Sequence, residues 1–284
     1  MAARAKTTTA TKRAPAATGV GAGLLAPARR FLRHHAPSPD PRGPRIPLGV
    51  GWFLLLIVAV FLRWLLPVVL AATAALAALQ TAGRAKEAGR PVQQPLAALG
   101  AAGLVGAASV STSLTGLVLL LFAAAALLLP PGRRPWPFDL DASGTAAWYT
   151  LRSGGPVGVA LASVVLVQGI DEAALGFLVI AVCAYDAGDY LISAGEPQGR
   201  WMGPLAGVAA TMVWTLAMAV FDPPPFSGGE PWVVGVVLSL CAPAGQWFAS
   251  TLLPRPTTRA AALRRVDSWL FAAPAFLVAV WVVL

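Results

Sequence analysis

The chain has 284 residues, of which 57% are hydrophobic and 12% are charged, and its formal net charge is +9. This composition is too apolar for an ordinary soluble domain and indicates a polytopic membrane protein. The two cysteines and two histidines show no disulfide or zinc spacing, and both histidines lie near the N-terminus, which leaves no imidazole for catalysis within the membrane.

Residues 1–45 contain nine Lys or Arg and a single acid, Asp40, so this segment alone accounts for a charge of +8. It is rich in Ala, Thr, Pro and Gly without apolar periodicity, which is typical of a disordered arm. We therefore expect a basic cytoplasmic tail over 1–45 that contacts anionic lipid headgroups, followed by one transmembrane domain over 46–284.

The segment 47–79 is almost unbroken apolar sequence, interrupted by Arg63 and Pro67. As one helix its 33 residues would be about 50 Å long, against a hydrocarbon core of about 30 Å, so we expect two helices that meet near 63–67. The remaining apolar segments predict spans over 94–110, 114–130, 156–169, 173–193, 203–221, 232–252 and 268–284. The expected fold is an all-α polytopic integral membrane protein with about nine transmembrane helices.

The basic residues predict the orientation of these spans. Outside the tail, every Lys and Arg except Arg63 falls in the loops 80–93, 131–155, 194–202 and 253–267. Nine alternating spans that start from a cytoplasmic N-terminus place all four loops in the cytoplasm, as the positive-inside rule requires. We therefore expect a protein of the cell (inner) membrane with its C-terminus outside.

The predicted span 173–193 carries Asp186 and Asp189 three residues apart, so both carboxylates project from one face. An Asp at the centre of a membrane helix costs roughly 2.5 to 3.5 kcal/mol on insertion, so these two require a partner, an ion or a wet cavity. One interpretation is a pair of interfacial acids that reach water or an arginine. The other is a cation site at the cytoplasmic surface, to which Asp267 contributes because the topology places it at the same side.

Three segments carry motif-like patterns. Residues 186–190 read Asp-Ala-Gly-Asp-Tyr, residues 197–203 read Pro-Gln-Gly-Arg-Trp-Met-Gly, and residues 265–274 read Arg-Val-Asp-Ser-Trp-Leu-Phe-Ala-Ala-Pro. They resemble the Asp-x-Gly-x-Tyr, Pro-Lys-Lys-Thr-Trp-Glu-Gly and closing Asp-Arg-x-Asp-Ser-x-Leu-Phe-Ala-Ala-Pro motifs of phosphatidate cytidylyltransferases. Those membrane enzymes make CDP-diacylglycerol from CTP and phosphatidate, and the similarity extends over 46–284.

The departures from the family are as informative as the matches. Gln198 and Gly199 replace two lysines, the family's Gly-Asp-x-x-Glu-Ser reads Gly-Gln-Trp-Phe-Ala-Ser over 245–250, and Arg264 replaces the first Asp of the closing motif. Cytidylyl transfer needs divalent cations to bridge the triphosphate and neutralise the leaving pyrophosphate. The resemblance therefore implies either a cytidylyltransferase with weak or lost activity, or a non-catalytic relative that binds phospholipid or nucleotide or scaffolds a partner. We find no inverted repeat that would favour a transporter.

The resemblance implies a set of site residues without assigning a catalytic one. The substrate-binding residues are Arg200, Trp201, Ser250, Arg264 and Arg265, and a degraded Mg²⁺ site comprises Asp186, Asp189 and Asp267. Two arrangements of this site stay open: a single cation held by Asp186 and Asp267, or Arg264 in the place of a lost metal ion, supplying its positive charge. The arginines also have a simpler explanation, because the positive-inside rule alone places them at the cytoplasmic side. The expected partners are membrane lipids, with phosphatidate and CTP if the enzyme is active, and no nucleic acid; a homodimer stays open.

Overall fold

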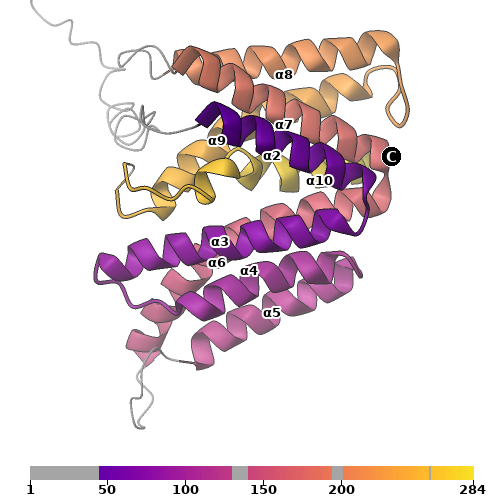
Figure 1. Ribbon diagram of the computed structural model, residues 1–284. Coiled ribbons are helices and arrows are strands. Elements are labelled where there is room, and N and C mark those ends of the chain that lie inside the picture. Colours follow the sequence, from indigo (N-terminus) through magenta and orange to yellow (C-terminus); the bar gives the residue numbers. More distant parts are fainter. Residues whose placement is uncertain (1–44, 130–139, 194–200, 256) are drawn as a thin grey trace, which may run out of the picture. The chain divides into compact units, whose positions relative to one another are not determined.

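The computed structural model describes residues 45–129, 140–193, 201–255 and 257–284, which belong to one compact unit, His35–Leu284. Over these residues every regular element is helical (Figure 1). The helices are α2 (Arg45–Phe61), α3 (Leu65–Glu87), α4 (Gln94–Ala108), α5 (Thr112–Leu128), α6 (Leu140–Ile170), α7 (Glu172–Ser193), α8 (Met202–Phe221), α9 (Glu230–Leu252), the short 3₁₀ helix η1 (Leu263–Arg265) and α10 (Trp269–Val283). The expected tail over 1–45 lies outside the described residues, apart from Arg45.

Five of these helices are long and apolar enough to cross a membrane: α3, α6 over Ser143–Ile170, α7, α8 and α9. The chain is therefore a helical membrane protein. The structure does not support the expected count of about nine spans, because the other apolar helices, Gly49–Phe61, α4, α5 and α10, have 10–17 residues. A helix needs about 20 residues to cross a hydrocarbon core of about 30 Å without distorting it.

The predicted break within 47–79 is confirmed. Helix α2 ends at Phe61 and α3 begins at Leu65, whose N–H donates to the carbonyl of Leu62 at 2.7 Å. Pro67 is the third residue of α3 and lies in its first turn. Backbone N–H groups of a first turn have no acceptor within the helix, so the N–H that proline lacks costs no hydrogen bond here.

The predicted loop over 131–155 is wrong for its second half. Helix α6 begins at Leu140 and runs for 31 residues through Pro156, whereas we expected a span over 156–169 only. The polar residues that suggested a loop have partners on the preceding segment: the Thr150 hydroxyl accepts from the backbone N–H of Gln93 at 3.0 Å. Gly154 lies so close to the carbonyl oxygen of Ala97 that a side chain would collide with it. Packing on α4 therefore stabilises helix in a segment whose composition does not favour it.

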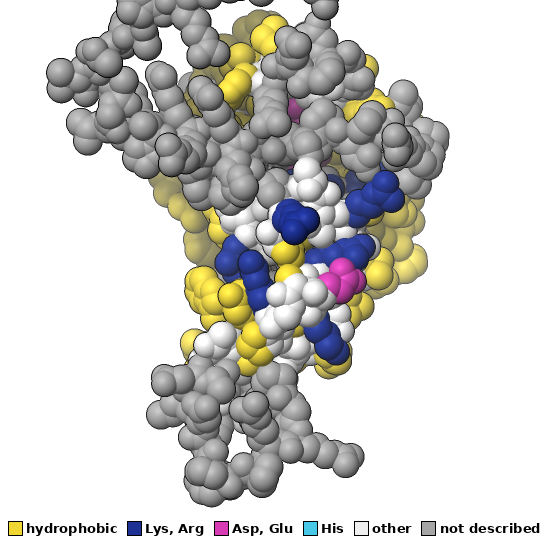
Figure 2. Space-filling model, turned by 90° about the vertical axis from the view of Figure 1, so that its left-hand side faces the viewer, with side chains coloured by type: hydrophobic (Ala, Val, Ile, Leu, Met, Phe, Trp, Pro, Cys, Tyr) yellow, Lys and Arg dark blue, Asp and Glu magenta, His cyan; other side chains and the backbone are white. Residues whose placement is uncertain are grey.

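The two ends of the helix bundle differ in charge. The α3–α4 and α9–α10 connections lie at the left in Figure 1, and the α2–α3, α4–α5, α6–α7 and α8–α9 connections lie at the right. At the left end, the Arg84 Nε donates to the carbonyl of Arg259 at 3.0 Å, and the N–H of Ala262 donates to Gln80 Oε1 at 2.9 Å. We call this end, formed by residues 80–93 and 253–268, the basic end; Figure 2 shows Lys and Arg side chains gathered on it.

The opposite end holds the connections at residues 62–64, 109–111, 171 and 222–229. Arg63, the one basic residue that the sequence places on this side, forms an ion pair with Glu172, with 3.0 Å between Nε and Oε1. We call this the opposite end.

Candidate functional site

Segments 186–190, 245–250 and 264–268, far apart in sequence, lie together near the basic end. Gln246 of α9 connects to α7 through both atoms of its amide: its Nε2 donates to Asp189 Oδ2 at 3.0 Å, and its Oε1 accepts from the Tyr185 hydroxyl at 3.0 Å. The second carboxylate oxygen of Asp189 accepts from the Ser193 hydroxyl at 3.0 Å. Both oxygens of this membrane carboxylate therefore have side-chain partners.

The segment before α10 contributes a second group of contacts. The Arg264 NH1 donates to the Ser250 hydroxyl of α9 at 3.0 Å and lies 3.4 Å from Asp267 Oδ2. The other carboxylate oxygen of Asp267 accepts from the N–H of Ser268 at 2.9 Å. Asp267 is 7% exposed, and its burial raises the pKa of the carboxyl to about 6 although the charge of Arg264 acts in the opposite direction.

Asp186 lies between these two groups. Its carboxyl is close enough to Asp267, Asp189 and Arg265 for their charges to interact. The hydroxyl of Ser268 is its neighbour, yet this fully buried hydroxyl makes no hydrogen bond of normal geometry. Among the three carboxylates, Asp186 is thus the one to which the structure assigns no strong hydrogen-bond donor.

Glycines bring the segments this close together. A Cβ on Gly245 of α9 would lie 2.5 Å from the carbonyl oxygen of Asp267, and a Cβ on Gly188 of α7 would lie 2.7 Å from that of Ala206 in α8. Gly203 lies against the side chains of Asp189 and Ser193, with no room for a Cβ. Because only glycine permits such backbone approaches, these positions fix the carboxylates relative to one another.

The remaining expected site residues lie around this group. Ser250 is fully buried and Arg264 bridges it to Asp267, so these two belong to the site. Arg265 lies against α2, because a Cβ on Gly49 would be 3.3 Å from its NH1. Trp201 precedes α8 and packs edge-on against Trp247 with 5.3 Å between ring centroids. Arg200 lies outside the described residues.

The fit of a Mg²⁺ ion depends on how many ligands the chain itself provides. Among the described residues, no group of three or more His, Cys, Asp and Glu side chains is arranged to hold a metal ion. Asp189 and Asp267 already have partners, so a cage made only of protein ligands does not fit. Asp186 suits the other common arrangement, in which one or two carboxylates and the phosphates of a nucleotide share the ion.

Sequence reasoning missed the central role of Gln246. It treated this residue as the loss of a family carboxylate, whereas the structure shows its amide bridging Tyr185 and Asp189. The detectable signal was an uncharged amide in the middle of an apolar helix, since a buried polar side chain requires a partner.

Comparisons of the chain with models of protein families, with curated proteins and with solved structures found no match.

Proposed function

We propose that the chain is a membrane protein of the phosphatidate cytidylyltransferase type that binds a phosphate-bearing ligand, phosphatidate or CTP, between α7, α9 and η1. One observation carries the proposal. Segments 186–190 and 265–274 match family motifs by residue pattern alone, and 245–250 stands where the family has a further motif; they lie together through the contacts Gln246–Asp189 and Arg264–Ser250, in which Arg264 directly precedes the closing motif. A chance resemblance gives no reason for such separate segments to be neighbours.

The residues of the site suit phosphate oxygens. Arg264 and Arg265 supply guanidinium donors, which match phosphate geometry, and the Ser268 hydroxyl is a further buried donor without a strong partner. A bound phosphate would draw Arg264 from Asp267, and the loss of that positive charge would raise the pKa of the Asp267 carboxyl further, which favours its neutral form and reduces the repulsion between carboxylate and phosphate. Mg²⁺ arriving with a nucleotide would neutralise triphosphate charge, with Asp186 as its protein ligand.

The non-catalytic alternative is favoured by a different observation. Asp189 is held by Gln246 and Ser193, and Asp267 by Arg264, so two of the three carboxylates are already engaged within the protein. A transferase that relies on two metal ions would leave those oxygens to the cations. We therefore propose ligand binding with weak or absent nucleotidyl transfer.

The test uses the full chain purified in detergent. CTP with Mg²⁺, and separately a short-chain phosphatidate, should raise the melting temperature, because a ligand that binds only the folded state stabilises it by mass action. Mg²⁺ alone should leave the melting temperature unchanged. Arg264→Gln should reduce both ligand-induced shifts, whereas Arg84→Gln, which removes an exposed arginine at the same end, should not. If neither ligand shifts the wild type, the proposal is wrong.

A second variant separates binding from chemistry. Gln246→Asp places a second carboxylate beside Asp189, so a divalent cation alone should then stabilise the folded protein. Transfer of the cytidylyl group from CTP to phosphatidate is measured for both proteins with Mg²⁺ or Mn²⁺. Rapid turnover by the wild type would exclude the non-catalytic alternative, and ligand-induced stabilisation without turnover would favour it.

We also propose the nine-span topology in the cell membrane, with the N-terminus in the cytoplasm and the C-terminus outside. It is supported by the pairing of loops predicted to share a side: residues 84 and 259 are in contact at one end, and Arg63 and Glu172 at the other. Single cysteines at positions 86 and 258 should react with a membrane-impermeant reagent only from the cytoplasm, and cysteines at 171 and at 227, the exposed neighbour of the buried Phe226, only from outside. Labelling of position 86 from outside would contradict this topology.

A further inference from the structure

Two arginines outside the site proposed above lie together near the basic end. The Arg152 side chain of α6 is half-buried, and its NH2 donates to the backbone carbonyl of Thr251 in the last turn of α9. The guanidinium carbon of Arg90, which follows α3, stands over the ring of Tyr149, 5.1 Å from its centroid. Tyr149 and Arg152 project from the same face of α6, and Arg90 is close enough to Arg152 for their charges to interact.

The backbone fixes the position of Arg90. Helix α3 ends in a Schellman motif, in which Gly89 has a φ of 76°, a left-handed conformation that favours glycine. The N–H groups of Gly89 and Arg90 donate to the carbonyls of Lys86 and Ala85 at 2.9 and 3.0 Å. The hydrogen bond to Thr150 then ties the α3–α4 connection to α6. The fold itself therefore brings the two arginines together.

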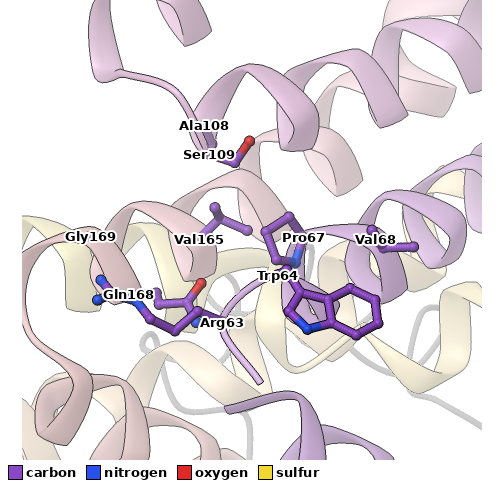
Figure 3. Close-up of a pocket in the computed structure, with 9 residues that line it drawn as sticks. All are labelled: Arg63, Trp64, Pro67, Val68, Ala108, Ser109, Val165, Gln168 and Gly169. Atoms are coloured by element: carbon purple, nitrogen blue, oxygen red, sulfur yellow. The ribbon is translucent and has the colours of Figure 1, made fainter. Parts of the chain in front are cut away.

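The charges of these two arginines are not balanced within the part of the chain that the structure describes. Among those residues no carboxylate forms an ion pair with Arg90 or Arg152, and the carbonyl that Arg152 contacts has no net charge. Arg63, which borders an open hollow at the opposite end (Figure 3), is instead paired with Glu172. Because like charges repel, an anion beside Arg90 and Arg152 would stabilise the pair.

The position of Arg152 along α6 indicates which anion this is. From Arg152 to Ile170, the last residue of the helix, α6 rises about 27 Å, close to the hydrocarbon core of about 30 Å that it crosses. Since Ile170 lies at the opposite end, Arg152 lies at the depth of the lipid headgroups on the other side. Guanidinium groups match the geometry of phosphate oxygens, and basic pockets between membrane helices bind anionic headgroups.

We propose that Arg90 and Arg152 bind the phosphate group of an anionic phospholipid from the leaflet at the basic end. Arg152 keeps its contact with the Thr251 carbonyl through one amino group and donates to the phosphate through its other N–H groups. Arg90 supplies the second guanidinium, which the ring of Tyr149 holds in place by a cation–π contact. This site does not include Arg264 and does not depend on the function proposed above.

The test counts lipids retained by the full chain. The protein is reconstituted in phosphatidylcholine vesicles that carry dioleoylphosphatidylglycerol or, in a second arm, dioleoylglycerol, which lacks the phosphate. It is then extracted in mild detergent and analysed by native mass spectrometry. The wild type should retain phosphatidylglycerol in preference to phosphatidylcholine, and no dioleoylglycerol. Arg90→Gln and Arg152→Gln should each weaken the retention of one phosphatidylglycerol roughly tenfold, the effect of one charge-assisted hydrogen bond.

A matched control and a competitor make the result specific. Arg255→Gln removes an exposed arginine near the same end, and with it the same general attraction for anionic lipid, so it should not change retention. Unchanged retention in Arg90→Gln, equal retention of dioleoylglycerol, or an equal loss in Arg255→Gln would overturn the proposal. Displacement of the lipid by an equal concentration of inorganic phosphate would assign the site to a soluble anion and overturn it too.

The two arginine variants also guard against a loss of folding. If Arg152→Gln fails to fold, Arg90→Gln decides the outcome, because among the described residues the Arg90 side chain contacts the tyrosine ring and forms no ion pair.

Discussion

The two ends of this membrane protein satisfy their buried polar groups in different ways. At the basic end, Gln246 joins Tyr185 to Asp189 and Arg264 joins Ser250 to Asp267, so the polar side chains of the candidate site bond to one another. At the opposite end, the amide nitrogen of Gln168 is buried without a hydrogen-bond partner among the described residues. A ligand at the candidate site must therefore compete with internal contacts of the protein, whereas the Gln168 nitrogen has no such contact to lose.

The same substitution at both ends tests this difference most directly. Gln246→Leu leaves the Tyr185 hydroxyl and the Asp189 carboxylate without their shared partner and should lower the free energy of unfolding by roughly 3–4 kcal/mol. Gln168→Leu replaces an amide that has no donor contact to lose, so it should be neutral or slightly stabilising in lipid-free detergent. Denaturant titration of both variants measures the difference, and similar losses would remove the distinction between the ends.

The second prediction concerns pH at the basic end. Burial raises the pKa of Asp267 to about 6, near Arg264, Asp186 and Asp189, whereas an Asp in the unfolded chain titrates near 3.8. The folded state therefore holds its proton more tightly, so this residue stabilises the fold fully below about pH 4 and loses that contribution as the pH rises through 6, by at most about 3 kcal/mol. Unfolding of the wild type and of Asp267→Asn from pH 4 to 7 measures it. The difference between them should fade toward pH 4.

The third prediction concerns the glycines. A Cβ at Gly245 would meet the carbonyl oxygen of Asp267 at 2.5 Å, so Gly245→Ala should destabilise the protein by roughly 1–3 kcal/mol and separate α9 from the closing motif. Gly176 has nothing within 4 Å of such a Cβ, so Gly176→Ala should be neutral or stabilising because alanine favours the helix. Thermal unfolding of the two variants compares them. A stable Gly245→Ala protein would show that the close approach is not needed.

The smallest expected effect is on the Arg63–Glu172 ion pair. Both side chains are more than half exposed, at 70% and 55%, so Arg63→Gln should lower stability by less than about 1 kcal/mol. The same denaturant titration measures this change. A stability loss comparable to that of Gln246→Leu would show that the Arg63–Glu172 ion pair holds the fold.

The sequence predicted the apolar helices well because hydrophobic run length carries most of that information. The separation of α2 from α3 followed from length together with the interruption at Arg63 and Pro67, since 33 residues exceed what one span requires. The first half of α6 could not be predicted, because its helix depends on contacts such as Thr150 with Gln93 and Gly154 with Ala97, which lie far apart in sequence.

The candidate site was predicted in part. The sequence identified Asp186, Asp189 and Asp267 as acids that converge on one end of the protein, and Arg264 as a positive charge close to them, without pairing Arg264 with Asp267. It did not reveal which side chains form hydrogen bonds with these acids. The bond from Gln246 to Asp189 joins α9 to α7, and no local pattern encodes a contact across 57 residues.

The short helix α5 has a consequence for the surrounding bilayer. Its 17 residues are about 26 Å long, and within it only Phe122 and Ala126 are buried, so in the proposed nine-span arrangement most of its surface would meet lipid directly. A hydrocarbon layer of about 30 Å that meets this helix is about 4 Å too thick, and hydrophobic mismatch of this kind is relieved by local thinning. Lipids that border α5 would be compressed, and the protein would partition into thinner regions of its membrane, where short acyl chains are enriched.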